Sequence, residues 1–313
     1  MKIQQKIILI APIYFNYHQM IINALEANGH QVDFIPDKNS GLLYSIANKS
    51  SLLLRKYQNI YKNEIIKRLT AVSYDRMIVI GGKTLKPDFW QSVRENHSFK
   101  MVLYQWDSIQ VFDYSSMIKS FDIVKTFDSV DAKNLNIPYL PLFYKNQNSK
   151  GEVLDIDLLF VGIWHSDRID VLNQIIKFAK QYGLKYFIKV YYPKYLYLYL
   201  VYIKKHFKKS DLFIFKPISS SEMKNLYQNA KCVIDINHPW QSGLTMRTIE
   251  TIGSGKKLIT TNDNIKNEVF FNSDMIEIIN RNNVQINREF FSNLSQYQNI
   301  EKFEINNWVL ELI

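Results

Sequence analysis

The stretch HPWQSGLTMRTIETIGSGKKLITTN, residues 238–262, carries the pattern that decides the fold. A turn-forming run that ends in Gly243 precedes a segment with the apolar spacing of a short helix. A Gly-Ser-Gly break at 253–255 then precedes the strand-like run 257–261, and another such run, 232–237, comes directly before the stretch. Strand, loop, helix and strand in this order are typical of a parallel α/β sheet.

The same alternation extends along the whole chain of 313 residues. Helices are predicted at 18–30 and 166–183, with Gly29 and Gly183 as their stops and Ser166 as an N-cap. A polar stretch at 145–152 divides two series of predicted strands. We therefore predict an α/β protein with two Rossmann-like domains, residues 1–145 and 152–313, that face each other across a cleft. The predicted strands are 6–12, 31–36, 75–82, 100–108, 121–128, 137–144, 155–162, 185–192, 211–217, 232–237 and 257–261.

Composition excludes several classes of protein. The single cysteine, Cys232, rules out a disulfide framework within the chain, and its apolar surroundings predict a small buried side chain. No apolar run reaches the roughly 18 residues that a transmembrane helix needs. The first apolar run reads as a strand rather than a signal peptide, so we expect a cytoplasmic protein.

The net charge of +10 is unevenly placed, because residues 171–210 hold nine lysines and no acidic residue. Such a segment indicates an anionic partner or, alternatively, a solvated lysine face. The run Tyr192–Lys209 combines tyrosines and leucines with lysines at its end. It fits a helix lying on the anionic inner face of a membrane, a strand, or a core crossover helix with a basic end.

The helix predicted after Gly243 has the features of a phosphate site. Ligands of open α/β sheets bind at the carboxyl ends of strands, and the first amides of a helix there attract anions. Arg247 adds a forked cationic donor, and Glu250 lies one turn further on the same face, where a carboxylate can accept hydrogen bonds from ribose hydroxyls. The alternative is an ordinary salt bridge between Arg247 and Glu250.

Metal and nucleic-acid sites are not expected. The six histidines are scattered, and the runs DID (155–157) and DIN (235–237), which look like an Asp-x-Asp metal motif, lie within strand patterns. Neither a Rossmann dinucleotide fingerprint nor a P-loop is present. No recognised nucleic-acid module accompanies the positive charge.

Four blocks carry a resemblance to a known group: LYQWDSI (103–109), TFDSVDAKNLNIPYLPLFY (126–144), FVGIWHSDRIDVL (160–172) and GLTMRTIETIGSGKKLITTN (243–262). They resemble GT-B glycosyltransferases, and more closely bacterial lipopolysaccharide- or capsule-biosynthesis proteins related to the CgeB-like glycosyltransferases. The resemblance implies transfer of a sugar from a nucleotide-sugar to a glycan or lipid-linked glycan acceptor. It implies no metal and no other cofactor. A non-catalytic nucleotide- or glycan-binding protein of the same fold is the alternative.

The resemblance implies a donor site in the second domain. Many retaining GT-B enzymes have a second glutamate eight positions before the ribose-binding one, but that position here is Ser242, which leaves the stereochemical outcome open. For the loop 160–168 the alternative is that Ser166 and Asp167 cap the helix and Arg168 is solvated. The residues expected to contact the donor are Gly162, His165, Arg168, His238, Gly243, Leu244, Thr245, Arg247 and Glu250.

Two residues of the first domain are candidates for catalysis. Asp107 ends a strand and can deprotonate an acceptor hydroxyl; alternatively it caps the turn through the amides of Ser108 and Ile109. His18, in the loop YFNYH (14–18), is a second candidate base or a structural histidine at a helix start. Asp128 and Asp131 read as helix caps.

Overall fold

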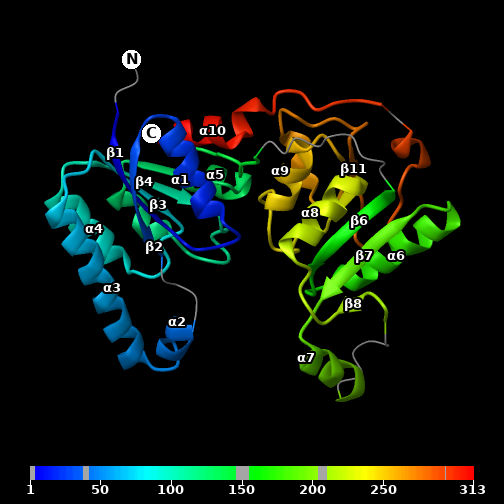
Figure 1. Ribbon diagram of the computed structural model, residues 1–313, viewed down its shortest axis with the longest axis horizontal. Coiled ribbons are helices and arrows are strands. Elements are labelled where there is room, and N and C mark those ends of the chain that lie inside the picture. Colours follow the sequence, from blue (N-terminus) through cyan, green and yellow to red (C-terminus); the bar gives the residue numbers. More distant parts are fainter. Residues whose placement is uncertain (1–3, 38–41, 146–154, 204–209, 293) are drawn as a thin grey trace. The chain divides into compact units, whose positions relative to one another are not determined.

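The computed structural model describes residues 4–37, 42–145, 155–203, 210–292 and 294–313, which form two compact units (Figure 1). Unit 1 comprises residues 1–143 together with 301–313, and unit 2 comprises residues 144–300. Each unit is built on one parallel sheet. The predicted α/β class with two parallel-sheet domains is therefore confirmed.

Unit 1 has a five-stranded sheet in the order β2-β1-β3-β4-β5. Its central strands are continuous apolar runs, as expected where both faces of a parallel sheet are covered. Helix α1 ends before Gly29, whose φ of +91° is the left-handed conformation that glycine adopts without strain. The strands are β1 (Lys6–Ala11), β2 (Gln31–Pro36), β3 (Arg76–Ile80), β4 (Lys100–Gln105) and β5 (Ile123–Thr126). The helices are α1 (Tyr17–Ala27), α2 (Leu42–Ala47), α3 (Ser51–Ala71), α4 (Pro87–Asn96), α5 (Ser129–Leu135) and α10 (Ile305–Trp308).

Unit 2 has a six-stranded sheet in the order β11-β10-β9-β6-β7-β8. Helix α6 buries Val171, Leu172 and Ile175 against the side chains of Leu158 and Phe160 on β6. The strands are β6 (Ile156–Ile163), β7 (Tyr186–Tyr191), β8 (Phe213–Ile214), β9 (Ala230–Asp235), β10 (Lys257–Thr260) and β11 (Ile276–Ile278). The helices are α6 (Arg168–Gln181), α7 (Lys194–Leu198), α8 (Ser220–Asn229) and α9 (Met246–Gly253).

The domain boundary at the C-terminus differs from the prediction, because residues 301–313 belong to unit 1 and not to the second domain. Trp308 explains the difference. Its fully buried ring packs edge-on against Tyr104 of β4 with centroids 4.9 Å apart, and its Nε1 donates to the carbonyl of Pro141 at 2.8 Å. Helix α10 lies beside α1 in Figure 1, where the Asn28 side chain donates to the carbonyl of Asn306 at 3.0 Å.

Two predicted strands are shorter or absent, and one short strand was not predicted. Of the run 137–144 only a single bridge between Tyr139 and Thr126 forms, and the run 211–217 contributes the two residues of β8. Strand β11 was not predicted, because its three residues give too short a pattern to detect.

Within the segment Tyr192–Lys209, residues 194–203 are helical, and the description ends at residue 203. Tyr197 is buried and packs against Phe213 at a centroid distance of 4.8 Å, whereas Tyr195 and Tyr202 are exposed. The four lysines expected to contact a membrane (Lys204, Lys205, Lys208 and Lys209) lie outside the described residues. Of the helices in the described ranges, none combines the length and the apolar character needed to span a bilayer.

Candidate functional site

The carboxyl ends of β6 and β9 in unit 2 are tied together by Arg168. This arginine is the first residue of α6 and is 7% exposed. Its Nη1 donates to the carbonyl of Ile163 at the end of β6, and its Nη2 to the carbonyl of Ile236 after β9, both at 2.5 Å. Burial and then the charge of Arg247 lower the pKa of Arg168 to about 9. Arg168 is thus held in place by the loop backbones rather than solvated.

Arg247 lies beside it, on the first turn of α9. The guanidinium carbons of Arg168 and Arg247 lie 5.3 Å and 5.0 Å from the centroid of the Phe160 ring. Arg247 donates to the carbonyl of Val161 at 2.5 Å, and its side chain keeps 27% exposure. Because like charges repel each other, two guanidinium groups against one ring need nearby hydrogen-bond acceptors and negative charge to stabilise them.

Gly162 makes this packing possible. A Cβ atom at this position would lie 2.9 Å from the Phe160 ring and 3.2 Å from the Arg168 guanidinium. A side chain here would displace one of the two groups. Gly162 therefore has a packing role, and its expected contact with the donor remains a prediction.

Asp235, the last residue of β9, compensates the positive charge. It is 2% exposed and accepts hydrogen bonds from the hydroxyls of Thr245 at 2.6 Å and Thr248 at 2.7 Å. Its other oxygen lies 3.7 Å from Nη1 of Arg247. The Asp235 carboxylate is thus part of a hydrogen-bond network that fixes the start of α9.

The turn before α9 is held by side chains on two sides. Thr245 is the N-cap, and its hydroxyl accepts from the backbone amide of Thr248 at 3.1 Å. Asn262, after β10, donates to the carbonyls of Ser242 at 3.0 Å and Gly243 at 3.2 Å. Leu244 is buried, so it anchors the turn instead of presenting a side chain to a ligand.

His165 and His238 meet at the same edge, one after β6 and the other after β9. Their ring centroids are 5.2 Å apart, and the ring of Trp240 lies 5.0 Å from that of His238. Burial, with the nearby charge of Arg168, lowers the pKa of His165 from 6.5 to about 4. His165 is therefore neutral at physiological pH.

Sequence reasoning missed Arg281, which follows β11. Its Nη1 donates to Asp167 at 2.8 Å, and its Nη2 donates to the side-chain oxygen of Asn237, also at 2.8 Å. Burial opposes ionisation of Asp167, but the Arg281 hydrogen bond and charge outweigh it and lower the pKa of this carboxyl. Arg281 was not recognised because the short strand before it, β11, was not predicted.

This pairing also changes the capping expected for α6. Asp167 occupies the N-cap position but makes no side-chain capping hydrogen bond. Ser166 has a φ of +42°, and its hydroxyl is 2.9 Å from Nδ1 of His165 and 3.1 Å from Asp167. The expected Ser166 cap is thus wrong, because Ser166 precedes the cap in a left-handed conformation.

Glu250 lies one turn beyond Arg247 on α9 and is partly exposed. The ion pair described for Arg247 is with Asp235. Burial raises the pKa of the Tyr227 phenol, and the negative charge of the nearby Glu250 carboxylate raises it further. Binding of ribose by Glu250 remains a prediction.

In unit 1, the loops after β1, β3 and β4 meet around Asp107. Asp107 forms an ion pair with Lys83 at 2.8 Å. Burial, with the Asp107 charge as a second cause, raises the pKa of Tyr14, which places this phenol near the carboxylate. The alternative role of Asp107 as a cap of Ile109 is not observed, since Asp131 accepts from that amide at 2.7 Å.

The other candidates of unit 1 take structural positions. The ring of His18 stacks on Phe34 of β2 at 5.2 Å, and no contact described for residues 4–37 and 42–145 joins it to Asp107. Asp128 caps α5, as predicted, by accepting from the amides of Val130 and Asp131.

The two acidic residues of DID are paired with lysines. Asp157 accepts from Nζ of Lys231 at 2.8 Å, and Asp155 forms an ion pair with Lys185. Within the described ranges, no group of three or more His, Cys, Asp or Glu side chains is arranged to bind a metal ion.

Comparison with known proteins places this geometry in a fold. No protein-family model matches the chain, and no curated protein sequence does so either. Among solved structures, UDP-GlcNAc 2-epimerase of Methanocaldococcus jannaschii, in complex with UDP-GlcNAc and UDP, is 12% identical with a TM-score of 0.53, and the match covers 98% of each chain.

Two further structures are similar. Staphylococcus aureus MnaA with UDP is 11% identical with a TM-score of 0.50, and the match covers 92% of this chain and 86% of that one. An α,α-trehalose-phosphate synthase (UDP-forming) from Burkholderia vietnamiensis is 9% identical with a TM-score of 0.55, over 82% of this chain and 84% of that one. These likenesses, with the two parallel α/β units, show that the chain has the GT-B fold.

Proposed function

We propose that the protein is a glycosyltransferase that binds a nucleotide-sugar at the carboxyl edge of the unit 2 sheet. The observation that carries this proposal is the prearranged cationic site at the start of α9. There Arg247, partly exposed, lies beside an N-terminal turn that is fixed by Thr245, Asp235 and Asn262. A fixed helix start with a forked cation beside it suits a diphosphate.

Some residues at this edge contact the donor, and others hold the loops in position. Arg247 and the α9 amides contact the diphosphate, while Glu250 accepts hydrogen bonds from the ribose. Arg168 has both terminal nitrogens on backbone carbonyls, so its role is to position the loops and to add positive charge. The neutral ring of His165, together with the rings of His238 and Trp240, forms a surface suited to the sugar or the phosphate.

The proposed chemistry needs one proton acceptor and a stabilised leaving group. The acceptor hydroxyl attacks the anomeric carbon of the donor, and the bond from that carbon to the diphosphate breaks. Asp107 of unit 1 takes the hydroxyl proton. The negative charge of the departing nucleoside diphosphate is balanced by Arg247 and the α9 amides without a metal.

The acceptor class rests on the resemblance of blocks such as residues 103–109 and 243–262 to proteins of lipopolysaccharide or capsule biosynthesis. We propose a bacterial surface glycan or its lipid-linked precursor as acceptor. Such an acceptor implies work at the cytoplasmic face of the membrane, where the Tyr192–Lys209 segment remains a candidate contact.

Epimerisation of the nucleotide-sugar is a second candidate. The match to UDP-GlcNAc 2-epimerase extends over 98% of both chains, so the same framework accommodates that reaction. It needs no acceptor, which gives a simple way to separate the two functions.

The test begins with a thermal-shift screen of uridine, guanosine and cytidine diphosphate sugars, followed by product analysis of the nucleotide-sugar that binds. Transfer predicts release of nucleoside diphosphate that depends on an added glycan acceptor. Conversion of the sugar without acceptor would establish an epimerase instead. Binding with neither reaction would favour the non-catalytic alternative.

A further inference from the structure

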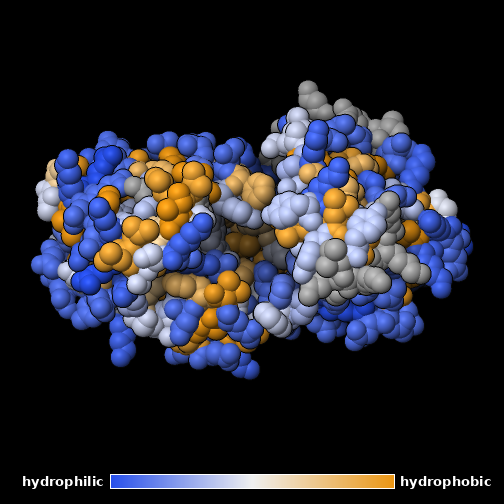
Figure 2. Space-filling model, turned by 90° about the horizontal axis from the view of Figure 1, so that it is seen from below, coloured by the Kyte–Doolittle hydropathy of each residue, from blue (hydrophilic) through white to orange (hydrophobic). Residues whose placement is uncertain are grey.

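The helical hairpin formed by α2 and α3 exposes an unusual amount of apolar surface. Six leucine and isoleucine side chains on α2 and the first half of α3 are 46% to 77% exposed. Figure 2 looks onto the end of unit 1 where this hairpin lies in Figure 1, and hydrophobic atoms gather on that side of the unit. Apolar clusters of this kind mark interaction surfaces. The six residues are Leu42, Leu43, Ile46, Leu52, Leu53 and Ile60.

The exposed residues lie outside the face of α3 that packs against the core of unit 1. Tyr61, Ile65 and Leu69 are buried in the core of unit 1. Leu53 and Ile60 lie seven positions apart on another face of the same helix. With Leu43 and Ile46 of α2 they line an open apolar groove of about 380 Å³. The hairpin thus has one stripe buried in the core of unit 1 and a second apolar stripe that is exposed.

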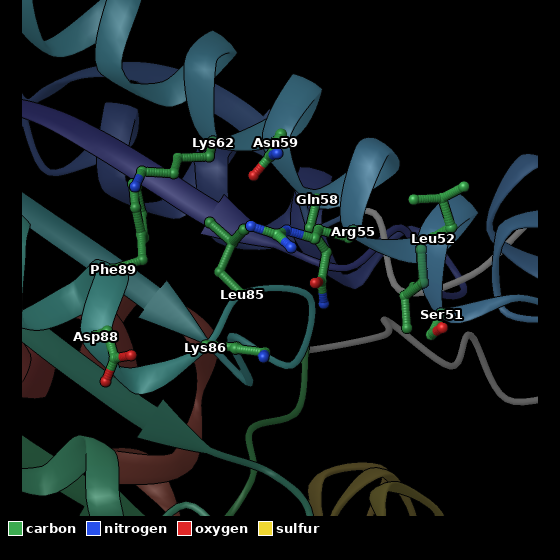
Figure 3. Close-up of a pocket in the computed structure, with 11 residues that line it drawn as sticks. Ser51, Leu52, Arg55, Gln58, Asn59, Lys62, Leu85, Lys86, Asp88 and Phe89 are labelled. Atoms are coloured by element: carbon green, nitrogen blue, oxygen red, sulfur yellow. The ribbon is translucent and has the colours of Figure 1, made fainter.

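The hairpin that carries this second stripe has a positive net charge. Residues 42–71 contain six basic side chains and one acidic one, Glu64. Arg55 and Lys62 of α3 and Lys86 before α4 line a neighbouring pocket of about 590 Å³, and Figure 3 shows these three side chains around it. The six basic side chains of the hairpin are Lys49, Arg55, Lys56, Lys62, Lys67 and Arg68.

We propose that the α2–α3 hairpin docks on the surface of an anionic lipid bilayer. Leu42, Leu43 and Leu52 enter the interface between headgroups and acyl chains, and the basic side chains contact lipid phosphates. Exposed leucines next to clustered lysine and arginine are the combination that binds such an interface. A second copy of the chain is a poor occupant, since two hairpins with this excess of positive charge repel each other. The proposal does not depend on the donor site of unit 2.

The experiment is co-sedimentation of the full chain with vesicles of phosphatidylcholine alone or with 30% phosphatidylglycerol, at low and high salt. Wild type is expected to bind only the anionic vesicles and to dissociate as salt rises. The triple variant Leu42→Ser, Leu43→Ser, Leu52→Ser should bind at least about tenfold more weakly. These side chains are more than 70% exposed, so the variant is expected to fold.

A matched control removes three exposed aliphatic side chains elsewhere: Val111→Ser, Val269→Ser and Leu294→Ser. This variant should bind vesicles like wild type. Both triple variants should keep the wild-type melting temperature and nucleotide affinity, which separates loss of docking from loss of the fold or of the donor site.

Hydrogen exchange on the vesicles locates the contact. Protection is expected at residues 42–62. Protection at 192–203 instead, or equal binding of the leucine variant and wild type, would overturn the proposal. So would the absence of wild-type binding at low salt. Concentration-dependent self-association that the leucine variant abolishes, without vesicle binding, would assign the hairpin to a second copy of the chain.

Discussion

The two sheets present different chemistry at their carboxyl edges, although both are parallel and follow the same strand–loop–helix logic. In unit 2 the edge is cationic, with Arg168, Arg247 and Arg281 fixed by backbone carbonyls and acidic side chains. In unit 1 it carries an acid–base pair, Asp107 and Lys83, below an exposed aromatic loop. Under the proposed function, this contrast suits one edge to an anion and the other to proton transfer.

The largest effect that would sharpen this comparison is expected at Asp107. If Asp107 is the general base, Asp107→Asn should lower the transfer rate by about 10²- to 10⁴-fold while donor affinity stays unchanged. Initial rates and calorimetric titration of the donor measure the two quantities. Asp113→Asn, an exposed acid of the same unit, is the control. An Asp107→Asn enzyme with the wild-type rate would leave unit 1 without its proposed base.

Arg247 provides the corresponding test in unit 2. Arg247→Gln should weaken nucleoside diphosphate binding by about 2 kcal/mol, because it removes a charged hydrogen-bond donor from the diphosphate. Arg247→Lys should recover only part of this loss, since lysine lacks the forked geometry. The control Arg288→Gln changes an exposed arginine of the same unit. Equal affinities for all three variants would exclude Arg247 from the donor site.

Glu250 separates ribose from diphosphate recognition. Glu250→Ala should weaken binding of a nucleoside diphosphate by roughly 1–3 kcal/mol and leave inorganic pyrophosphate binding unchanged. Competition titrations measure both affinities, with the exposed acid of Glu222→Ala as control. If pyrophosphate affinity falls equally, Glu250 stabilises the start of the helix and does not bind the ribose.

The low pKa of His165 makes the free energy of unfolding depend on pH. Its pKa of about 4 in the folded chain lies below its ordinary value of 6.5, so the unfolded chain binds the proton more tightly. The resulting stability is present above pH 6.5 and is lost as pH falls toward 4. Because solvent screens this half-buried ring, wild type should lose only about 1 kcal/mol more unfolding free energy than His165→Gln between pH 7 and 4. Urea denaturation across this range measures it, and parallel curves would contradict the burial of His165.

The smallest effect is expected from chelation. If cationic side chains and helix amides balance the leaving group, transfer should persist in excess EDTA. Initial rates with and without EDTA check this. Complete loss that magnesium or manganese restores would show that a metal shares the role assigned to Arg247.

The sequence predicts the architecture well where its signals are local. Continuous apolar runs mark β1, β3, β6 and β9, and Gly29 and Gly183 mark helix ends. The packing of α10 on unit 1 is not predictable in this way, because the contact between Trp308 and Pro141 joins residues 167 positions apart.

The candidate site shows the same division. The start of α9, with Gly243, Thr245 and Arg247, can be read from turn and helix signals alone. The part taken by Arg281 cannot, because it depends on the pairing of a three-residue strand, β11, with β10. Nor does the sequence show that Arg168 and Arg247 share the ring of Phe160, since that follows from tertiary packing.

The central claim is that the nucleotide binds at the unit 2 edge. Hydrogen exchange of the full chain with and without a saturating nucleoside diphosphate tests it most directly. The account predicts slower exchange in peptides that cover residues 160–168 and 238–250, with the peptides of residues 104–110 unchanged. Protection confined to unit 1, with residues 238–250 exchanging as in the free protein, would contradict it.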